Sequence, residues 1–301
     1  MPAAAVDSQI GVVRSVKALR ARVDSWRSAG ESVGLVPTMG ALHDGHLSLI
    51  RRSNSLVGKT VASIFVNPAQ FAPHEDFGSY PRREALDLDL LQKAGCHLAY
   101  IPTPEEMYPE GFQTSIAVTS LTQGLCGASR PHFFGGVATV VAKLLNQARP
   151  DIAVFGEKDY QQLLVIRRMV KDLNLQVDII GAPILREADG LAMSSRNAYL
   201  GADERAVAGK LNKILKDLAA TLEAGGDIDA ALRAGRERLA GAGFSTIDYL
   251  EVRSADALAP MATGAVDRPA RIFAAVILGK TRLIDNWPVE AASSSSYANF
   301  R

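Results

Sequence analysis

The chain has few cysteines and almost no net charge. Its 301 residues include two cysteines, Cys96 and Cys126, which is too few for a disulfide framework or a cysteine-rich metal site. The formal net charge of +1 gives no bulk attraction to nucleic acid or to an anionic membrane. No apolar run approaches the roughly 20 residues that span a bilayer, and residues 1–11 lack the pattern of a signal peptide. These absences predict a cytoplasmic protein with no nucleic-acid or membrane partner.

Several common catalytic motifs are also missing. The sequence contains no G-x-x-x-x-G-K-[ST] phosphate loop, no G-x-G-x-x-G after the first predicted strand and no G-x-S-x-G nucleophile elbow. No candidate covalent nucleophile stands out. We therefore expect catalysis by charge stabilisation and positioning, without an enzyme-bound intermediate.

Short apolar runs alternate with helix-period segments as far as residue 180. Strands are predicted at 34–36, 60–66, 98–101, 152–155 and 177–180, and helices at 47–57, 83–94, 137–148 and 161–173. This alternation predicts an α/β fold with a Rossmann-like parallel sheet and helices on both faces. Ligands of such sheets bind outside the carboxyl ends of the strands. The loops after Val36, Val66 and Phe155 are therefore the candidate sites.

The pattern changes near Arg186. Two amphipathic helices are predicted at 203–223 and 228–240. Strands follow at 248–252, 271–278 and 281–285, and Gly279-Lys280 is a candidate hairpin turn between the last two. We predict a larger domain over 1–185, a smaller C-terminal α+β domain over 186–290 and a disordered tail over 291–301.

The segment Pro37-Thr38-Met39-Gly40-Ala41-Leu42-His43-Asp44-Gly45-His46 lies between a predicted strand and a predicted helix. His43 and His46 are three residues apart and so share one face of a helix, with Asp44 or Gly45 as the expected cap. The N-terminus of a helix favours anions, and imidazoles can donate hydrogen bonds to phosphate oxygens. The histidines could instead be surface or capping residues. Zinc is disfavoured because no third ligand follows at a usual spacing, and the Thr-Met-Gly turn favours a phosphate site.

Two further segments follow predicted strands. In Val66-Asn67-Pro68-Ala69-Gln70-Phe71 the amides could orient a hydroxyl or a carboxylate, although the segment alone is better explained as an exposed proline turn. In Phe155-Gly156-Glu157-Lys158-Asp159-Tyr160-Gln161-Gln162, glycine permits close approach of the backbone and Lys158 suits a phosphate. Asp159 could cap a helix or bind ribose or Mg²⁺, and Gln162 would face the same cleft. A surface loop with a Lys–Asp pair is the alternative.

A last segment, Leu185-Arg186-Glu187-Ala188-Asp189-Gly190-Leu191-Ala192-Met193-Ser194-Ser195-Arg196-Asn197, ends in two hydroxyls beside an arginine. This combination could clamp a triphosphate, or it could be an interdomain linker with a solvated charge. His132 precedes a glycine-rich helix start and could also contact a polyphosphate, but an exposed turn explains it equally well.

Taken in order, these segments resemble the pantothenate synthetase (pantoate–β-alanine ligase) family over roughly residues 12–288. The resemblance is carried by PTMGALHDGH at 37–46, SIFVNPAQF at 63–71, YPR at 80–82, FGEKDYQQL at 155–163, LREADGLAMSSRN at 185–197 and RLIDN at 282–286. The HxGH element alone is common to a broad nucleotidyltransferase superfamily, whereas the combination is much narrower. The resemblance implies condensation of pantoate with β-alanine by means of ATP, through a pantoyl adenylate, with release of pyrophosphate and AMP.

The resemblance also implies roles for individual residues. His46 matches the catalytic histidine, and we predict that His43 and Lys158 stabilise charge with it. Gln70 matches a contact to both pantoate and β-alanine, and Gln162 matches a contact to pantoate. The implied ATP contacts are Met39, Gly40, Ala41, Leu42, His43, Asp44, Gly45, His46, Gly156, Glu157, Lys158, Asp159, Leu185, Met193, Ser194, Ser195 and Arg196. Mg²⁺ is implied by the polyphosphate without a dedicated protein metal site, and a homodimer is implied. His132 is left outside the site because RPHFFGGV stands where the family pattern is RPxHFxGV.

Two other classes of function remain as alternatives. One is a different HxGH nucleotidyltransferase, which forms a dinucleotide or charges tRNA. The net charge, the lack of an anticodon-binding extension and the uncharged Gln70 and Gln162 disfavour it. The other is a non-catalytic nucleotide-binding regulator, which has no need of His43, His46 and Lys158 together.

Overall fold

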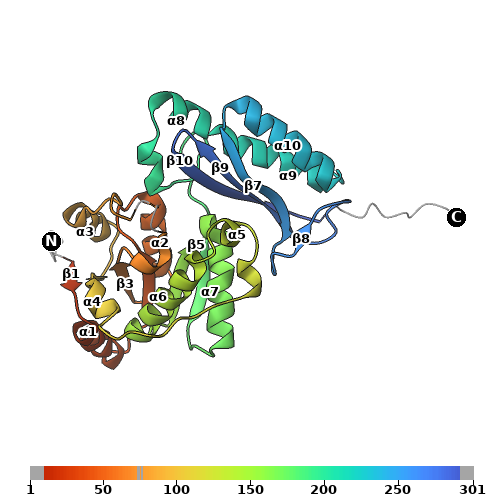
Figure 1. Cartoon of the computed structure of the whole chain (residues 1–301). Helices are drawn as coiled ribbons and strands as arrows, with labels where there is room; N and C mark the ends of the chain where they lie inside the picture. Colours follow the sequence, from red (N-terminus) through yellow and green to blue (C-terminus); the bar gives the residue numbers. More distant parts are fainter. Residues whose placement is uncertain (1–9, 73–74, 76, 292–301) are drawn as a thin grey trace, which may run out of the picture. The chain divides into compact units, whose positions relative to one another are not determined.

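A computed structural model describes residues 10–72, 75 and 77–291 of the chain (Figure 1). The predicted disordered tail lies outside the described residues from position 292 onward. The chain divides into two units, which are described separately. The first unit draws on Met1–Thr122, Arg130–Glu157 and Val165–Pro183, and the second on Gln123–Ser129, Lys158–Leu164 and Ile184–Arg301.

The first unit is built on a six-stranded sheet in the order β1-β4-β3-β2-β5-β6. All of its strand pairs are parallel, which confirms the predicted parallel α/β fold. The strands are β1 (Gly11–Val13), β2 (Val33–Thr38), β3 (Lys59–Ile64), β4 (Leu98–Tyr100), β5 (Ile152–Gly156) and β6 (Asp178–Ala182). Strand β1 was not predicted, because three residues at a sheet edge leave little pattern in the sequence.

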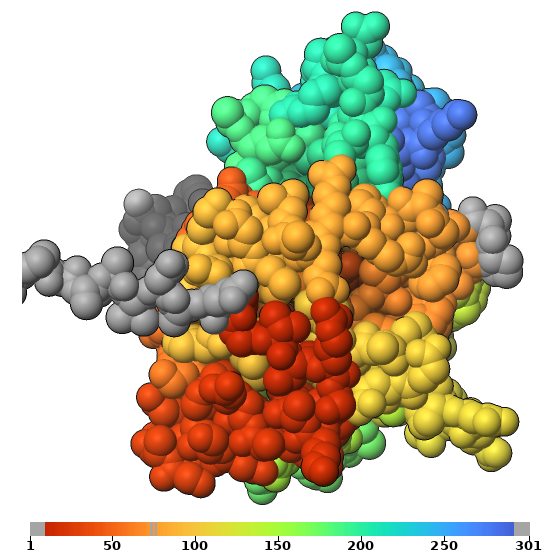
Figure 2. Space-filling model, turned by 90° about the vertical axis from the view of Figure 1, so that its left-hand side faces the viewer, coloured from red at the N-terminus to blue at the C-terminus, as the bar shows by residue number. Residues whose placement is uncertain are grey.

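Helices cover both faces of this sheet. Helices α1 and α6 pack on each other and on β2, while α2 packs on α3 and against β2, β3 and β5 (Figure 1). The helices of this unit are α1 (Val16–Ser28), α2 (Asp44–Asn54), α3 (Glu84–Lys93), α4 (Pro104–Met107), α6 (Phe133–Ala148) and the later part of α7 (Tyr160–Asp172), with 3-10 turns η1 (Pro68–Gln70) and η2 (Ser120–Thr122). The 3-10 turn η3 (Glu157–Asp159) begins with the last residue of a first-unit segment and continues into the second unit. Figure 2 shows residues 104–120, in yellow, at the surface of the first unit.

The strand order places the candidate ligand site at one edge of the sheet. Strand β2 lies between β3 and β5, so the chain leaves β2 toward β3 and later returns to its other side. Open α/β sheets bind ligands at such a switch point. Helix α2 is anchored there because Leu47, Leu49 and Ile50 are buried with residues of β2 and β5. The loops after β2, β3 and β5 therefore leave neighbouring strands at one edge, as predicted.

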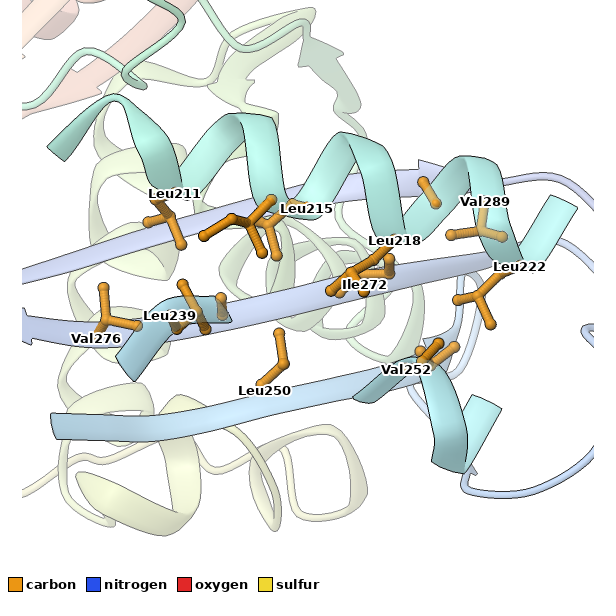
Figure 3. Packing of buried hydrophobic residues seen from close by; sticks show 14 of the residues in the cluster. Leu211, Leu215, Leu218, Leu222, Leu239, Leu250, Val252, Ile272, Val276 and Val289 are labelled. Carbon is orange, nitrogen blue, oxygen red and sulfur yellow. The ribbon is translucent and has the colours of Figure 1, made fainter. Parts of the chain in front are cut away.

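The second unit contains an antiparallel sheet in the order β10-β9-β7-β8, and this confirms the predicted C-terminal α+β part. Its strands are β7 (Thr246–Ser254), β8 (Pro260–Met261), β9 (Ala270–Leu278) and β10 (Thr281–Val289). Its helices are α5 (Cys126–Ser129), α8 (Ala202–Ala208), α9 (Lys210–Glu223) and α10 (Ile228–Ala242), with the 3-10 turn η4 (Ser195–Tyr199). Figure 3 shows leucines of α9, among them Leu211, Leu215 and Leu218, packed over Ile272 and Val276 of β9.

One element of the second unit differs from its prediction. The single helix predicted at 203–223 is wrong, because Gly209 separates α8 from α9. A Cβ atom at position 209 would lie 2.4 Å from Oδ2 of Asp189. Glycine is a poor helix former, and here it allows the backbone to approach Asp189.

Candidate active site

His43 is the N-cap of α2, and His46 lies in the first turn of the helix. The Nδ1 atom of His43 accepts a hydrogen bond from the backbone N–H of Gly45 at 3.1 Å. The Nδ1 atom of His46 accepts from the backbone N–H of His43 at 3.4 Å. The two rings lie with their centroids 4.1 Å apart. The expectation that Asp44 or Gly45 caps the helix is wrong, because the ring nitrogen of His43 serves as the capping acceptor.

These hydrogen bonds fix the tautomers of the two histidines. A neutral imidazole nitrogen that accepts a hydrogen bond carries no proton, so the proton of each ring resides on Nε2. His43 and His46 thus each present an Nε2–H donor at the positive end of the α2 dipole. Both side chains are only half-buried. Two such donors at a helix N-terminus are suited to a negatively charged ligand.

The backbone of the β2–α2 loop is held by Asp87 of α3, which the sequence analysis missed. Its carboxylate accepts from the N–H of Ala41 at 3.0 Å and from the N–H of Leu42 at 2.8 Å. Gly40 and Ala41 have positive φ angles of 80° and 50°, a conformation that costs free energy for alanine. Asp87 is 1% exposed, and burial raises the pKa of this carboxyl above its ordinary value. The loop is therefore stabilised in a strained shape by a buried acid.

Gln70 lies in η1, directly after β3, and is buried. Asn67 is 1% exposed and Gln70 is 8% exposed, so the interpretation of this segment as a turn with exposed amides is wrong for both amides. The Nε2 atom of Gln70 lies 3.1 Å from Sδ of Met39. The structure thus brings together two predicted site residues from neighbouring strand ends.

The backbone of η1 packs closely against α6, which is distant in sequence. A Cβ atom on Gly136 would lie 2.3 Å from the carbonyl oxygen of Ala69, so glycine is needed for this close approach. Arg130 adds a second restraint, because its Nη2 donates to the carbonyl of Gln70 at 3.2 Å while it pairs with Glu75 at 2.6 Å. The backbone of Gln70 is therefore fixed from two directions.

The loop after β5 holds the next predicted residues. Gly156 ends β5, and Glu157, Lys158 and Asp159 form η3. A Cβ atom on Gly156 would meet its nearest atom, Cδ2 of Leu49, at an ordinary 4.0 Å. No close approach to protein therefore requires this glycine. Lys158 is half-buried and Asp159 is exposed.

Residues 185–193 form a closed hairpin within the second unit. Arg186 and Ala192 form an antiparallel bridge, and the N–H of Met193 donates to the carbonyl of Leu185 at 3.0 Å. Arg186 makes a bidentate ion pair with Asp285, at 2.7 and 3.0 Å. The charge of Arg186 is therefore paired within the second unit.

Ser194, Ser195 and Arg196, the predicted triphosphate clamp, follow that hairpin directly. Ser194 is the N-cap of η4, and its Oγ accepts from the N–H of Arg196 at 3.2 Å. Ser195 and Arg196 are half-buried. The hydroxyl of Ser194 is thus used to start the turn on which Arg196 is presented.

Strand β10 connects the predicted phosphate segments of the second unit. Asp285 binds Arg186, and the side chain of Asn286 donates to the carbonyl of Lys158 at 3.0 Å. Arg271 of β9 stacks over the ring of Tyr160, with its guanidinium carbon 3.9 Å from the ring centroid. The RLIDN motif thus has a structural role that the sequence analysis did not assign.

The predicted residues fall into two groups. In the first unit, the structure brings together the segment Met39–His46 and Gln70. In the second unit, β10 connects Lys158 to the hairpin that begins at Leu185. Gln162, the third residue of α7, is half-buried in the second unit. His132 is an exposed residue at the start of α6, and its side chain makes no capping hydrogen bond there.

Two features are absent from the described residues. No cluster of three or more His, Cys, Asp or Glu side chains with the arrangement of a metal site occurs among them. None of their helices is long and apolar enough to cross a membrane.

A parallel sheet with a histidine-capped helix at its switch point is an architecture of nucleotide-binding α/β proteins. The chain belongs to the pantoate–β-alanine ligase family, because the family model "Pantoate-beta-alanine ligase" matches residues 11–288.

Individual relatives agree with this assignment. The chain is 56% identical over 285 residues to a pantothenate synthetase of Paramagnetospirillum magneticum, covering 95% of this chain and 100% of the relative. It is 57% identical over 281 residues to one of Mesorhizobium japonicum, covering 93% and 98%.

Solved structures show the same fold. The pantothenate synthetase of Thermus thermophilus superposes with a TM-score of 0.86 at 46% identity, covering 92% of this chain and 99% of that chain. A pantoate–β-alanine ligase from Francisella tularensis, complexed with β,γ-ATP and β-alanine, gives 0.78 at 32% identity, covering 92% and 97%.

Proposed function

We propose that this protein condenses pantoate with β-alanine at the expense of ATP, giving pantothenate, AMP and pyrophosphate through a pantoyl adenylate. Membership of the pantoate–β-alanine ligase family supports the reaction. The ligands of the Francisella tularensis complex support ATP and β-alanine as substrates. The observation that carries the proposal is that Nδ1 of both His43 and His46 accepts a backbone hydrogen bond at the N-terminus of α2, which leaves Nε2 of each ring as the donor.

In the first step, a carboxylate oxygen of pantoate attacks the α-phosphorus of ATP. The bond from that phosphorus to the bridging oxygen breaks, and pyrophosphate leaves with its electron pair. Negative charge builds on the phosphoryl oxygens, so fixed donors accelerate the step without proton transfer. We assign this stabilisation to His46 with His43 and Lys158, helped by Ser194, Ser195 and Arg196. Met39–Asp44, Gly45, Gly156, Glu157, Asp159, Leu185 and Met193 complete the proposed ATP contacts.

In the second step, the free amine of β-alanine attacks the acyl carbon of the adenylate. The amide bond forms, AMP departs and the amine gives up a proton. Gln70 and Gln162 hold the two small substrates, since neutral amides suit hydroxyl and carboxylate oxygens. We further propose that residues 1–185 bind ATP and pantoate and that residues 186–290 act as a lid, because an acyl adenylate must be kept from water.

Mg²⁺ enters the proposal with the nucleotide. Such an ion keeps several waters and is commonly held by substrate phosphates with one or two carboxylates. The buried carboxylate of Asp87 already accepts two backbone hydrogen bonds, which leaves the exposed Asp159 as the better fit of these two acids. The positive charge of Mg²⁺ would help to neutralise the polyphosphate. A cytoplasmic location remains our expectation from the composition, and a homodimer remains our expectation from the family resemblance.

One assay separates this function from the alternatives. Purified protein is given ATP with pantoate, with β-alanine or with both, and AMP and pyrophosphate are measured. The proposal requires AMP formation that depends on both acids. Transfer of the nucleotide to another molecule without release of AMP, or binding of ATP without turnover, would overturn it.

A further inference from the structure

A chain of three polar side chains in the first unit ends at Gln70. The hydroxyl of Tyr108 donates to Oδ1 of Asn67 at 2.7 Å. The Nδ2 atom of Asn67 donates to Oε1 of Gln70 at 3.1 Å. The Nε2 atom of Gln70 then lies 3.1 Å from Sδ of Met39, a residue of the β2–α2 loop. The chain of hydrogen bonds therefore runs from Tyr108 to the candidate site.

The direction of these hydrogen bonds is fixed by the backbone. Amide oxygen and nitrogen are distinguished only by their partners. Oδ1 of Asn67 accepts from the N–H of Ala69, which can only donate, at 3.3 Å. Nδ2 of Asn67 donates to the carbonyl of Gly136, which can only accept, at 3.2 Å. Asn67 must therefore donate a hydrogen bond from Nδ2 to Gln70, and Gln70 must accept it with Oε1.

The amide of Gln70 consequently turns its nitrogen toward Met39. A thioether is a weak hydrogen-bond acceptor, so a ligand oxygen that replaced it would gain a stronger hydrogen bond. With its oxygen engaged by Asn67, Gln70 can recognise a substrate only as a donor. The groups that such a donor selects are carboxylate and hydroxyl oxygens.

Tyr108 is suited to hold this arrangement. Its contact of 2.7 Å with the Asn67 amide is shorter than the contacts of that amide with Gln70, Ala69 and Gly136. Its ring packs against those of Phe65 and Phe112, with centroids 6.2 and 5.1 Å away. Burial raises the pKa of Tyr108 to about 12, so the hydroxyl keeps its proton at neutral pH.

We propose that Tyr108 is a positioning residue which, through Asn67, holds Gln70 as a hydrogen-bond donor to a carboxylate or hydroxyl oxygen of the small substrates. The inference rests on the proposed function, because it concerns how those substrates are recognised. It assigns no contact between Tyr108 and a ligand.

The test compares Tyr108→Phe, Gln70→Ala and the double variant in the condensation assay. Tyr108→Phe keeps the ring and removes the hydroxyl, so the KM for pantoate or β-alanine should rise about 3- to 15-fold, as loss of one hydrogen bond does. The KM for ATP should stay within about twofold. In the Gln70→Ala background the same change should add less than about twofold, because its effect passes through Gln70.

A second comparison tests the polarity itself. Gln70→Glu preserves the shape but cannot donate at neutral pH, so it should impair use of the small substrates at least as much as Gln70→Ala. For Tyr108→Phe the matched control is Phe112→Leu, because this variant alters the ring packing around Tyr108 and leaves the hydroxyl in place.

The outcomes separate the two proposals. A full Tyr108→Phe effect in the Gln70→Ala background, or a loss in kcat with every KM unchanged, overturns the role of Tyr108. In that case the wild type still makes the product, and the proposed function stands. A wild type that needs neither acid for AMP formation overturns the proposed function and this inference with it.

Discussion

Asn286 of β10 donates from Nδ2 to the backbone carbonyl of Lys158, 128 residues away in sequence, at 3.0 Å. The preceding residue, Asp285, forms the bidentate ion pair with Arg186. Two consecutive residues of one strand thus fix two loops to which we assign contacts with the phosphates of ATP. The precision of those loops depends on a strand that makes no proposed contact with substrate.

We therefore predict that Asn286→Ala weakens use of ATP. The carbonyl of Lys158 loses its donor, and leaving this partly buried acceptor without a partner should lower the free energy of unfolding by about 1–3 kcal/mol. The KM for ATP should rise more than that for β-alanine in steady-state kinetics. Arg268→Ala is the control, because Arg268 pairs with Asp267 at the surface, where the side chains are 61% and 63% exposed. Equal KM changes for both substrates would contradict this placement.

His46→Ala should lower the rate of adenylate formation by about 10²–10³, the usual cost of removing one preorganised donor. Pantoate-dependent exchange of pyrophosphate into ATP measures this step alone. The fold should survive, because His46 is only half-buried and its hydrogen bond from the backbone of His43 is long, at 3.4 Å. Circular dichroism checks that point. Near-normal exchange by the variant would remove His46 from the mechanism.

Adjacent glycines in α6 should respond in opposite ways. Gly136→Ala forces a methyl group into the backbone of η1, with 2.3 Å to the carbonyl of Ala69, and should cost about 1–3 kcal/mol. It should also raise the KM values of the small substrates, because Gln70 moves. Gly135→Ala meets only the carbonyl of Ile116 at 3.9 Å, so it should be neutral or stabilise the helix by up to about 1 kcal/mol. Thermal unfolding of both variants makes the comparison, and similar losses would refute it.

Asp87→Asn should alter the pH dependence of stability in one direction. Burial raises the pKa of Asp87 in the folded protein, so the folded state keeps this proton to higher pH than the unfolded chain does. The stability that protonated Asp87 contributes is fully present at pH values below its pKa in the unfolded chain. This stability is lost as the pH rises through its pKa in the folded protein. The advantage of the wild type over Asp87→Asn should therefore shrink as pH rises through that window, then level off.

The same variant should be less active at neutral pH. An asparagine retains one acceptor for the loop, but its NH₂ group faces a backbone N–H. Asp89→Asn is a matched control, since Asp89 pairs with Lys93 at the exposed side of α3. Denaturant titrations from acidic to neutral pH would measure the stability difference, and parallel curves for wild type and Asp87→Asn would rule out the effect.

Much of the fold could be predicted because strand and helix periods are local. The parallel sheet, the helices that follow the candidate loops and the β9–β10 hairpin all leave such patterns in the sequence. The prediction of one helix at 203–223 failed at Gly209, where the missing side chain lets the backbone approach Asp189, a contact that helix periodicity does not encode. The loops after β2, β3 and β5 were predicted to converge because parallel strands end on one side of a sheet. The strand order agrees, since β2 lies between β3 and β5.

The site was harder to predict where partners are distant in sequence. Asn67 and Gln70 are polar and adjoin a proline, so their burial became visible only with α6 packed over them. Asp87 carried a weak signal, since an acid on the buried side of a helix needs donors, but those donors belong to a loop 46 residues earlier. The roles assigned to the site residues, from His43, His46 and Gln70 to Lys158, Gln162 and Ser194–Arg196, all stay predictions.

The cap of α2 bears on any attempt to make this protein more heat-resistant. Serine, threonine, aspartate and asparagine are the common N-caps, and a screen for melting temperature would favour them at position 43. Each would retain the capping acceptor that His43 now supplies to Gly45, and each would discard the Nε2–H donor. Selection for heat resistance alone would thus remove a donor that we assign to the active site, so such a screen must score turnover in parallel.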